Sequence, residues 1–188
     1  MSTTHTNTIP DAPNGAGQTT LFGLYAPLLL RNGYSPVPLE PCSKRPLSAF
    51  GDWSRLRETS LSEAEIATIA AEHRHAGLGV AGGYGGLVPI DIDTEDKDIL
   101  AAIATVLPEP LVAKRGRRGA TTFFRDPSGI IMPRKFKGRD GNMLLEVLVT
   151  GQTAIPPTIH PETGSPYQWL TDYTLFDVCI DELPEFPS

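Results

Sequence analysis

The sequence has little of several features that define whole classes of protein. It holds only two cysteines, Cys42 and Cys179, among 188 residues, which excludes a disulfide framework and a zinc site built from cysteine ligands. No apolar run approaches the ~18 residues that a membrane-spanning helix needs. Residues 1–20 lack the apolar stretch of a secretory signal. We therefore expect a cytoplasmic protein that does not contact membranes.

Positive charge is also scarce, and it is unevenly distributed. The formal net charge of -6 argues against a protein that coats nucleic acid without specificity. Nine of the sixteen Lys and Arg residues nevertheless lie between positions 114 and 139, where only Asp126 opposes them; they are Lys114, Arg115, Arg117, Arg118, Arg125, Arg134, Lys135, Lys137 and Arg139. Such a stretch suits a groove for a triphosphate or a nucleic-acid backbone, because guanidinium groups bind phosphate oxygens in a fork. The alternative is a solvated hairpin with charged tips.

Patterning divides the chain into a disordered N-terminal segment (residues 1–18), one domain (19–175) and a loosely packed C-terminal tail (176–188). Apolar spacing and capping residues predict helices over residues 21–33, 60–74 and 96–107. Residues 77–93 read as a hairpin of two short strands around a glycine-rich turn. Further strands are predicted at residues 34–41, 111–115, 120–125, 142–149 and 153–158. Helices alternate with strands early and strands dominate late, which indicates a mixed α+β domain.

Two acidic residues end an apolar strand at positions 91 and 93. Residues i and i+2 of a strand project from the same face, roughly 6.6 Å apart along the chain. Because two like charges at that separation repel each other, Asp91 and Asp93 predict a divalent metal held by oxygen ligands. The alternative is a strand end whose carboxylates face water or lie near a helix cap.

A third carboxylate, Glu146, interrupts the apolar run of residues 142–149. A glutamate is almost never fully buried without a partner. Three carboxylates on adjacent strands would make a site for two metal ions, the arrangement that activates a 3′-hydroxyl and steadies a leaving pyrophosphate. The alternative places Glu146 on the solvent face of a half-exposed strand.

Several segments, taken in order, resemble a known family. They read YAPLLLRNGYSPVPLEP (25–41), SKRPL (43–47), GLGVAGGYGGLVPIDID (77–93), RRGATTFFR (117–125) and LLEVLVTGQTAIPPTIHPETGSPYQW (144–169), with Trp53 between the second and third. This order is similar to that of the bifunctional DNA primase-polymerase domain of the archaeo-eukaryotic primase superfamily, found in plasmid and phage replication proteins. The resemblance covers about residues 22–170. It implies an RRM-like antiparallel sheet with flanking helices, preceded by a small α/β lobe.

By that resemblance Asp91, Asp93 and Glu146 would be catalytic and would hold two Mg²⁺ or Mn²⁺ ions. Nucleotide phosphates would meet Lys44, Arg117, Arg118, Thr121, Arg125 and His160, with Tyr167 and Trp169 closing the last motif. For His160 a purely structural role in its turn is an equal alternative. DNA would meet Lys114, Arg115, Arg134, Lys135, Lys137 and Arg139. The implied partners are a DNA template and primer, nucleoside triphosphates and a replicative helicase on another domain or chain.

One position departs from the family pattern. Thr121 stands where the family carries a histidine that contacts the nucleotide's phosphates, and a hydroxyl has no charge to offer them. Losing one charge-assisted hydrogen bond costs on the order of 1.5 to 3 kcal/mol. A primase-like module that binds DNA without catalysis is therefore one alternative. A second is a phosphatase of the Asp-x-Asp-x-Thr type, in which Asp91 would be the nucleophile and Asp93 the general acid.

Overall fold

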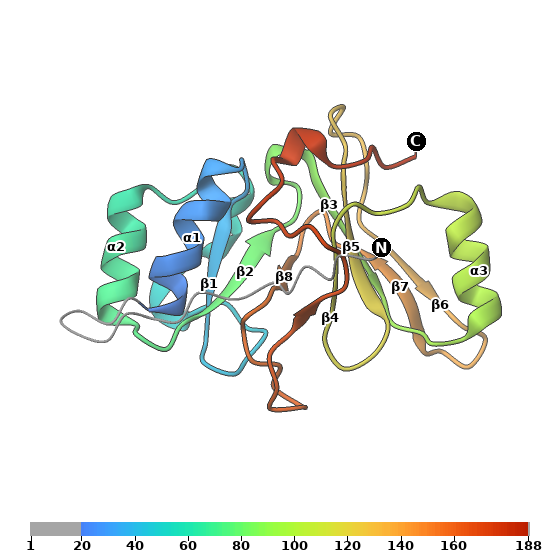
Figure 1. The fold of residues 1–188 in the computed structure, drawn as a ribbon, viewed down its shortest axis with the longest axis horizontal. Helices are drawn as coiled ribbons and strands as arrows, with labels where there is room; N and C mark the ends of the chain where they lie inside the picture. The colour runs from blue at the N-terminus through green and yellow to red at the C-terminus, as the bar shows by residue number, and fades with distance from the viewer. Residues whose placement is uncertain (1–19, 188) are drawn as a thin grey trace, which may run out of the picture.

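The computed structural model describes residues 20–187, which form two antiparallel sheets with helices on their outer sides (Figure 1). The predicted N-terminal disordered segment, residues 1–18, lies outside the described residues. Within them the chain is a mixed α+β fold, as the sequence predicts. No helix of the described part combines the length and the apolar character that crossing a bilayer requires.

Three helices form where the pattern predicts them: α1 (Leu21–Arg31), α2 (Glu63–Glu72) and α3 (Lys97–Val106). Each begins at a side chain that accepts hydrogen bonds from free backbone N–H groups. Ser62 and Glu65 form a reciprocal capping box on α2. Asp96 caps α3 by accepting from the N–H groups of Asp98 and Ile99. The caps therefore fix where α2 and α3 start.

The smaller sheet has three strands in the order β1 (Pro36–Leu39), β2 (Gly77–Ala81) and β8 (Gln152–Ala154). Helices α1 and α2 pack on its outer side, at the left of Figure 1. Phe22 and Leu29 of α1 are fully buried in the main core together with Leu78 of β2. The same core continues into the larger sheet, since it also includes Leu87 and Phe123.

The larger sheet has six strands. Their order is β6 (Arg134–Lys137), β7 (Met143–Val147), β3 (Leu87–Ile92), β5 (Ala120–Arg125), β4 (Ala113–Arg115) and β9 (Gln168–Trp169). Helix α3 covers the face turned away from the smaller sheet (Figure 1), where Ile103 packs against the apolar cluster that includes Ile90 and Ile92. The other face looks toward the smaller sheet. Short 3₁₀ turns at Ser48–Phe50, Trp53–Arg57, Tyr84–Gly86 and Ile180–Glu182 complete the elements.

The hairpin predicted over residues 77–93 is wrong, although both of its strands exist. Strand β2 pairs with β1 and β8, whereas β3 pairs with β5 and β7. The glycines between them take positive φ angles, 85° at Gly83 and 82° at Gly86, and lead the chain from one sheet into the other. Residues 148–151 cross between the sheets at the same place, and the N–H of Gly82 donates to the carbonyl of Gly151. The two crossings hold the sheets together beside the N-terminal half of β3, where the N–H of Leu148 donates to the carbonyl of Pro89.

The C-terminal segment packs tightly, so the prediction of a loose tail is wrong. Leu175 and Leu183 are at most 1% exposed. The Tyr34 hydroxyl donates to the carbonyl of Val178 at 2.9 Å, and the Asn32 amide donates to the carbonyl of Leu175 at 3.1 Å. These apolar residues follow neither helical nor strand spacing, because they fill the space between two sheets. Periodicity therefore carried no signal for them.

Two strands were not predicted. Strand β6 is exposed along its whole length, so it lacks the alternation that marks a half-buried strand. Strand β9 is only two residues long. Both are outer strands of the larger sheet.

The tightest backbone approach near the acidic end of β3 predicts a stability difference between two glycines. A Cβ on Gly119 (φ 59°) would lie 1.9 Å from the carbonyl oxygen of Ile92, whereas one on Gly129 (φ 67°) would meet no atom within 4 Å. We expect Gly129→Ala to lose about 1–2 kcal/mol of unfolding free energy, from left-handed strain alone. Gly119→Ala should lose roughly 3 kcal/mol or more, because β3 and β5 must also part. Urea denaturation measures both, and equal losses would contradict the close approach.

Candidate active site

One row of side chains crosses the larger sheet at the acidic end of β3. Asp91 pairs directly with Glu146 of β7 on one side and with Thr121 of β5 on the other. Lys135 of β6 lies beyond Glu146, and Lys114 of β4 lies beyond Thr121. Directly opposed residues of antiparallel strands project from the same face, with Cβ atoms about 4.5–5.5 Å apart. The five side chains therefore stand on one face in the order Lys135, Glu146, Asp91, Thr121, Lys114.

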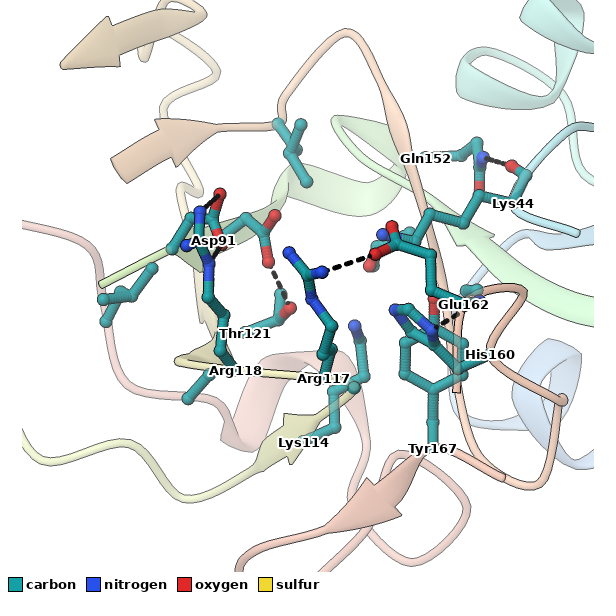
Figure 2. A pocket seen from close by; sticks show the side chains of 17 residues that line it. Lys44, Asp91, Lys114, Arg117, Arg118, Thr121, Gln152, His160, Glu162 and Tyr167 are labelled. Atoms are coloured by element: carbon teal, nitrogen blue, oxygen red, sulfur yellow. Dashed lines mark hydrogen bonds and ion pairs between the residues drawn. The ribbon is translucent and has the colours of Figure 1, made fainter. Parts of the chain in front are cut away.

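Each carboxylate at this end of the sheet has its own donor. The Thr121 hydroxyl donates to Asp91 Oδ1 at 2.7 Å, and Arg118 donates to both oxygens of Asp93 at 2.6 and 2.9 Å (Figure 2). Lys135 Nζ lies 2.9 Å from Glu146 Oε1. In this arrangement no three His, Cys, Asp or Glu side chains within residues 20–187 gather closely enough to hold a metal ion. The register places Asp91 directly opposite Glu146, while the three carboxylates face organic cations and a hydroxyl.

Arg118 controls the protonation of Asp93. Its hydrogen bonds to the carboxylate lower the pKa of Asp93 below the ordinary value for an aspartate, and the charges of Lys44 and Arg117 act in the same direction. Asp93 is therefore held as a carboxylate at neutral pH, the form that can bind a cation.

The acidic row borders a cavity of about 250 Å³ between the two sheets. Figure 2 shows its labelled side chains converging from the ends of β3 and β5, from β8 and from the segment that carries His160 and Tyr167. Four cations line it, Lys44, Lys114, Arg117 and Arg118, together with the acids Asp91, Asp93 and Glu162. The lining is thus rich in groups that bind phosphate oxygens.

Lys114 is the most buried of these cations, with 4% of its surface exposed. Its Nζ lies over the ring of Tyr167, 4.7 Å from the centroid, and it takes part in none of the ion pairs found within residues 20–187. Burial lowers the pKa of Lys114 from its usual 10.5 to about 8, although the charge of Asp91 opposes the change. The ammonium group is therefore poorly compensated where it stands.

His160 lies in the same wall and is 3% exposed. Its Nδ1 accepts from the N–H of Glu162 at 3.1 Å, and its ring packs against Tyr167 at 5.0 Å between centroids. Burial, followed by the charge of Lys44, lowers the pKa of His160. The neutral ring thus keeps its proton on Nε2. His160 orders its own turn and also lines the cavity, so the geometry is compatible with both roles considered from the sequence.

The nine basic residues of positions 114–139 lie in four places. Lys114, Arg117 and Arg118 line the cavity, where Arg117 also pairs with Glu162 at 2.9 Å. Arg125 lies at the far end of β5, where it donates to the carbonyl of Leu183 and pairs with Glu185 at 2.7 Å. The structure does not bring Arg125 to the cavity.

The remaining basic residues lie outside the cavity. Arg115 is exposed and donates to the carbonyl of Gly119. Arg134, Lys135, Lys137 and Arg139 are exposed on the hairpin of β6 and β7. This last group matches the hairpin alternative, while the cavity group matches the groove.

Lys44, Gln152 and Glu162 also line the cavity. The carbonyl of Lys44 accepts a hydrogen bond from Gln152. Gln152 and Glu162 were not predicted as site residues, although both lie within residues 144–169, which carry part of the family resemblance. Trp169, in contrast, packs edge-on against Phe176, 5.9 Å between ring centroids, and belongs to the core.

A larger hollow of about 890 Å³ lies between α3 and the hairpin of β6 and β7, on the opposite face. Its walls are mainly aliphatic and aromatic, with only Asp98 and Arg134 charged. It holds no pair of carboxylates, so the smaller polar cavity is the candidate for chemistry.

The burial of Lys114 predicts a stability gain when its charge is removed. The folded protein releases the Lys114 proton near pH 8 and the unfolded chain near pH 10.5, so wild-type stability should rise with pH between these values. Lys114→Met should be more stable than wild type at pH 7, by at most about 3 kcal/mol, and the difference should shrink as the pH rises toward 10. Urea denaturation at pH 7 and pH 9.5 measures it. A variant less stable than wild type at pH 7 would show that Lys114 is held in a stabilising pair.

Comparison with known proteins identifies the family of the chain. A family model described as "Bifunctional DNA primase/polymerase, N-terminal" matches residues 26–186. No match to the chain was found among curated proteins. The family match extends through the C-terminal segment that packs into the core, and it covers the acidic row and the cavity together. The chain therefore belongs to the bifunctional DNA primase/polymerase N-terminal family.

Proposed function

We propose that this domain transfers a nucleotide from a nucleoside triphosphate to the 3′-hydroxyl of a strand on a DNA template. The observation that carries the proposal is the position of Asp91, which lies between Glu146 and Thr121 in one cross-strand row, beside a cavity lined by four cations. Carboxylates next to phosphate-binding cations are what phosphoryl transfer needs, because that chemistry depends mainly on positioning and charge stabilisation.

Asp91, Asp93 and Glu146 would supply the carboxylate oxygens for Mg²⁺ or Mn²⁺ once their present partners are displaced. Asp91 of β3 lies directly opposite Glu146 of β7, and Asp93 follows the end of β3 and lines the same cavity as Asp91. Hard divalent ions prefer carboxylate oxygens. The present partners of the three carboxylates are a hydroxyl and two exposed cationic side chains, Arg118 and Lys135. Exposed ion pairs contribute about 0–1 kcal/mol, so these partners can be displaced. When bound, such ions would activate the attacking hydroxyl and neutralise charge on the phosphates.

The protein's own side chains would bind and orient the triphosphate. Lys44, Arg117 and Arg118 line the cavity from different segments of the chain, so they can surround a polyphosphate from more than one side. Arg118 lies next to Asp93 and would lose that partner to a metal, which frees its guanidinium for a phosphate. Thr121 keeps Asp91 oriented through its hydroxyl.

The DNA would lie over the exposed basic hairpin of β6 and β7. Arg134, Lys135, Lys137 and Arg139 lie there without burial, and phosphate contacts of this kind carry no sequence information. A cytoplasmic role in the replication of a plasmid, phage or other mobile element, with a helicase as partner, is part of this proposal. It is supported only by the family resemblance.

The phosphatase alternative conflicts with the geometry at Asp93. A general acid needs a raised pKa to hold a proton near neutral pH, whereas Arg118 lowers the pKa of Asp93. The non-catalytic alternative rests on Thr121, which supplies no charge. It predicts DNA binding without any metal-dependent incorporation of nucleotides.

The acidic pair gives the decisive test of catalysis. Asp91→Asn with Asp93→Asn removes both charges at nearly constant shape, and we expect primer extension and de novo synthesis with Mg²⁺ or Mn²⁺ to fall by about a thousandfold or more, the effect of several kcal/mol of lost charge stabilisation. Asp96→Ser is the matched control, because serine also caps α3 and Asp96 lies outside the cavity lining. Extension by the double variant at the wild-type rate would refute the assignment. Wild-type hydrolysis of phosphomonoesters without extension would support the phosphatase.

Glu146 gives a separate test, because it pairs with Lys135 in this structure. If it binds metal together with Asp91, Glu146→Gln should raise the Mn²⁺ concentration needed for half-maximal extension by about tenfold or more and lower the maximal rate. Lys135→Met removes only its partner and should not raise the required Mn²⁺ concentration. Identical metal dependence of Glu146→Gln and wild type would leave Asp91 and Asp93 as the only carboxylate ligands.

A further inference from the structure

We propose that Lys114 is the cation at the floor of the cavity that binds the phosphates of the incoming nucleotide, rather than part of the DNA-binding surface expected from the sequence. The proposal rests on the proposed function and assigns a residue and a ligand class to one wall of its site. It is carried by the placement of Lys114 and by the groups around it.

The first argument is that Lys114 is buried without a counterion. Only 4% of the surface of Lys114 is exposed, yet the residue lines the cavity. No ion pair within residues 20–187 includes it; its Nζ lies over the Tyr167 ring, and Asp91 acts on it only as a nearby charge. A buried charge is usually paired. An unpaired ammonium that borders a cavity therefore points to an anionic ligand that enters the cavity.

The second argument is the position of Lys114 in the cross-strand row. It stands directly opposite Thr121, which is hydrogen-bonded to Asp91. An anion bound by Lys114 would thus lie close to Asp91, the carboxylate that is proposed to bind metal, because only Thr121 stands between the two residues in the row. The ring of Tyr167, itself packed on His160, limits where the ammonium group can move, so the lysine is positioned before any ligand arrives.

The third argument distinguishes a nucleotide from DNA. The DNA backbone is a continuous chain of phosphodiesters and needs an open surface, such as the exposed hairpin of β6 and β7. A triphosphate has a free end of small cross-section, which can enter a cavity of about 250 Å³. Lys44 and Arg117 line the same cavity, so several cations can share one polyphosphate. The burial of Lys114 therefore favours a nucleoside triphosphate over the template.

Lys114→Met tests this inference by binding as well as by rate. We expect its Kd for a nucleoside triphosphate with Mg²⁺, measured by calorimetry without DNA, to rise about ten- to a hundredfold, the loss of one charge-assisted hydrogen bond. Its Kd for inorganic tripolyphosphate should rise similarly, while its Kd for primer–template DNA should change by less than about twofold. In extension assays KM for the nucleotide should rise more than kcat falls. Lys97→Met, an exposed lysine on α3, is the matched control and should leave all of these constants unchanged.

A second variant separates a binding role from a structural one. Lys114→Ala should regain nucleotide affinity when ethylammonium is added, because a small cation can occupy the vacated space and donate hydrogen bonds. Tetramethylammonium, which cannot donate, should not restore it. Failure of either Lys114 variant to fold, a folded Lys114→Met with wild-type nucleotide affinity, or a loss confined to DNA affinity would each overturn the inference.

Nucleotide binding and primer extension by the wild-type protein test the proposed function separately from the assignment of Lys114. Wild type that binds a triphosphate but never extends a primer defeats the proposed transfer and leaves Lys114 as a phosphate-binding residue. Wild type that extends primers while Lys114→Met matches it in nucleotide Kd and KM defeats only the assignment of Lys114.

Discussion

The antiparallel pairing of β3 with two neighbours is the constraint on which the site depends. Because the side-chain period of a strand is two, a slip of one residue would move Asp91 and Asp93 to the opposite face of the sheet. The register is fixed from both sides. Val88, Ile90 and Ile92 must stay buried beneath α3, and the close approach of Gly119 to the carbonyl of Ile92 sets how β5 begins. The apolar face of β3 therefore positions the acidic residues on its other face.

Side chains of the protein itself neutralise two carboxylates near the acidic row, while one lysine in the row has no anionic partner within the described part of the chain. Arg118 holds both oxygens of Asp93, Lys135 holds Glu146, and Lys114 remains nearly buried without an anion. Divalent ions alone would meet the carboxylates but would add positive charge beside Lys44 and Lys114. Phosphates alone would meet the lysines but would lie next to uncovered carboxylates. A triphosphate that arrives with its divalent ions satisfies both sets, which is the electrostatic reason to expect the two ligands to bind more tightly together than apart.

Local signals in the sequence predicted the helices well, because capping residues and apolar spacing placed α1, α2 and α3. Asp91 and Asp93 line the same cavity, although β3 ends at Ile92, one residue before Asp93. The pairing of Asp91 with Glu146 needed the added assumption that their strands are neighbours, which the structure confirms. The pairing of strands that are distant in the sequence, and the packing of the C-terminal residues, could not be predicted from local patterns. Nothing local to residues 77–93 shows that β2 and β3 enter different sheets, nor that the aperiodic residues after 174 fill the space between those sheets. The burial of Lys114 was missed for the same reason, because an Ala-Lys-Arg strand reads as exposed until its neighbours across the sheet are known.

The two ends of the cross-strand row differ in how exposed their lysines are. Lys114 and Lys135 stand at its two ends on the same face, yet one is buried beside a cavity and the other is exposed on an edge hairpin. A buried ammonium suits a compact ligand with a free polyphosphate end, and an exposed basic edge suits a continuous backbone. The two substrates would then approach the carboxylates from opposite ends of one row and meet over Asp91. Under the proposed function, the order Lys135, Glu146, Asp91, Thr121, Lys114 across the sheet would place the carboxylates between the binding sites of the two substrates.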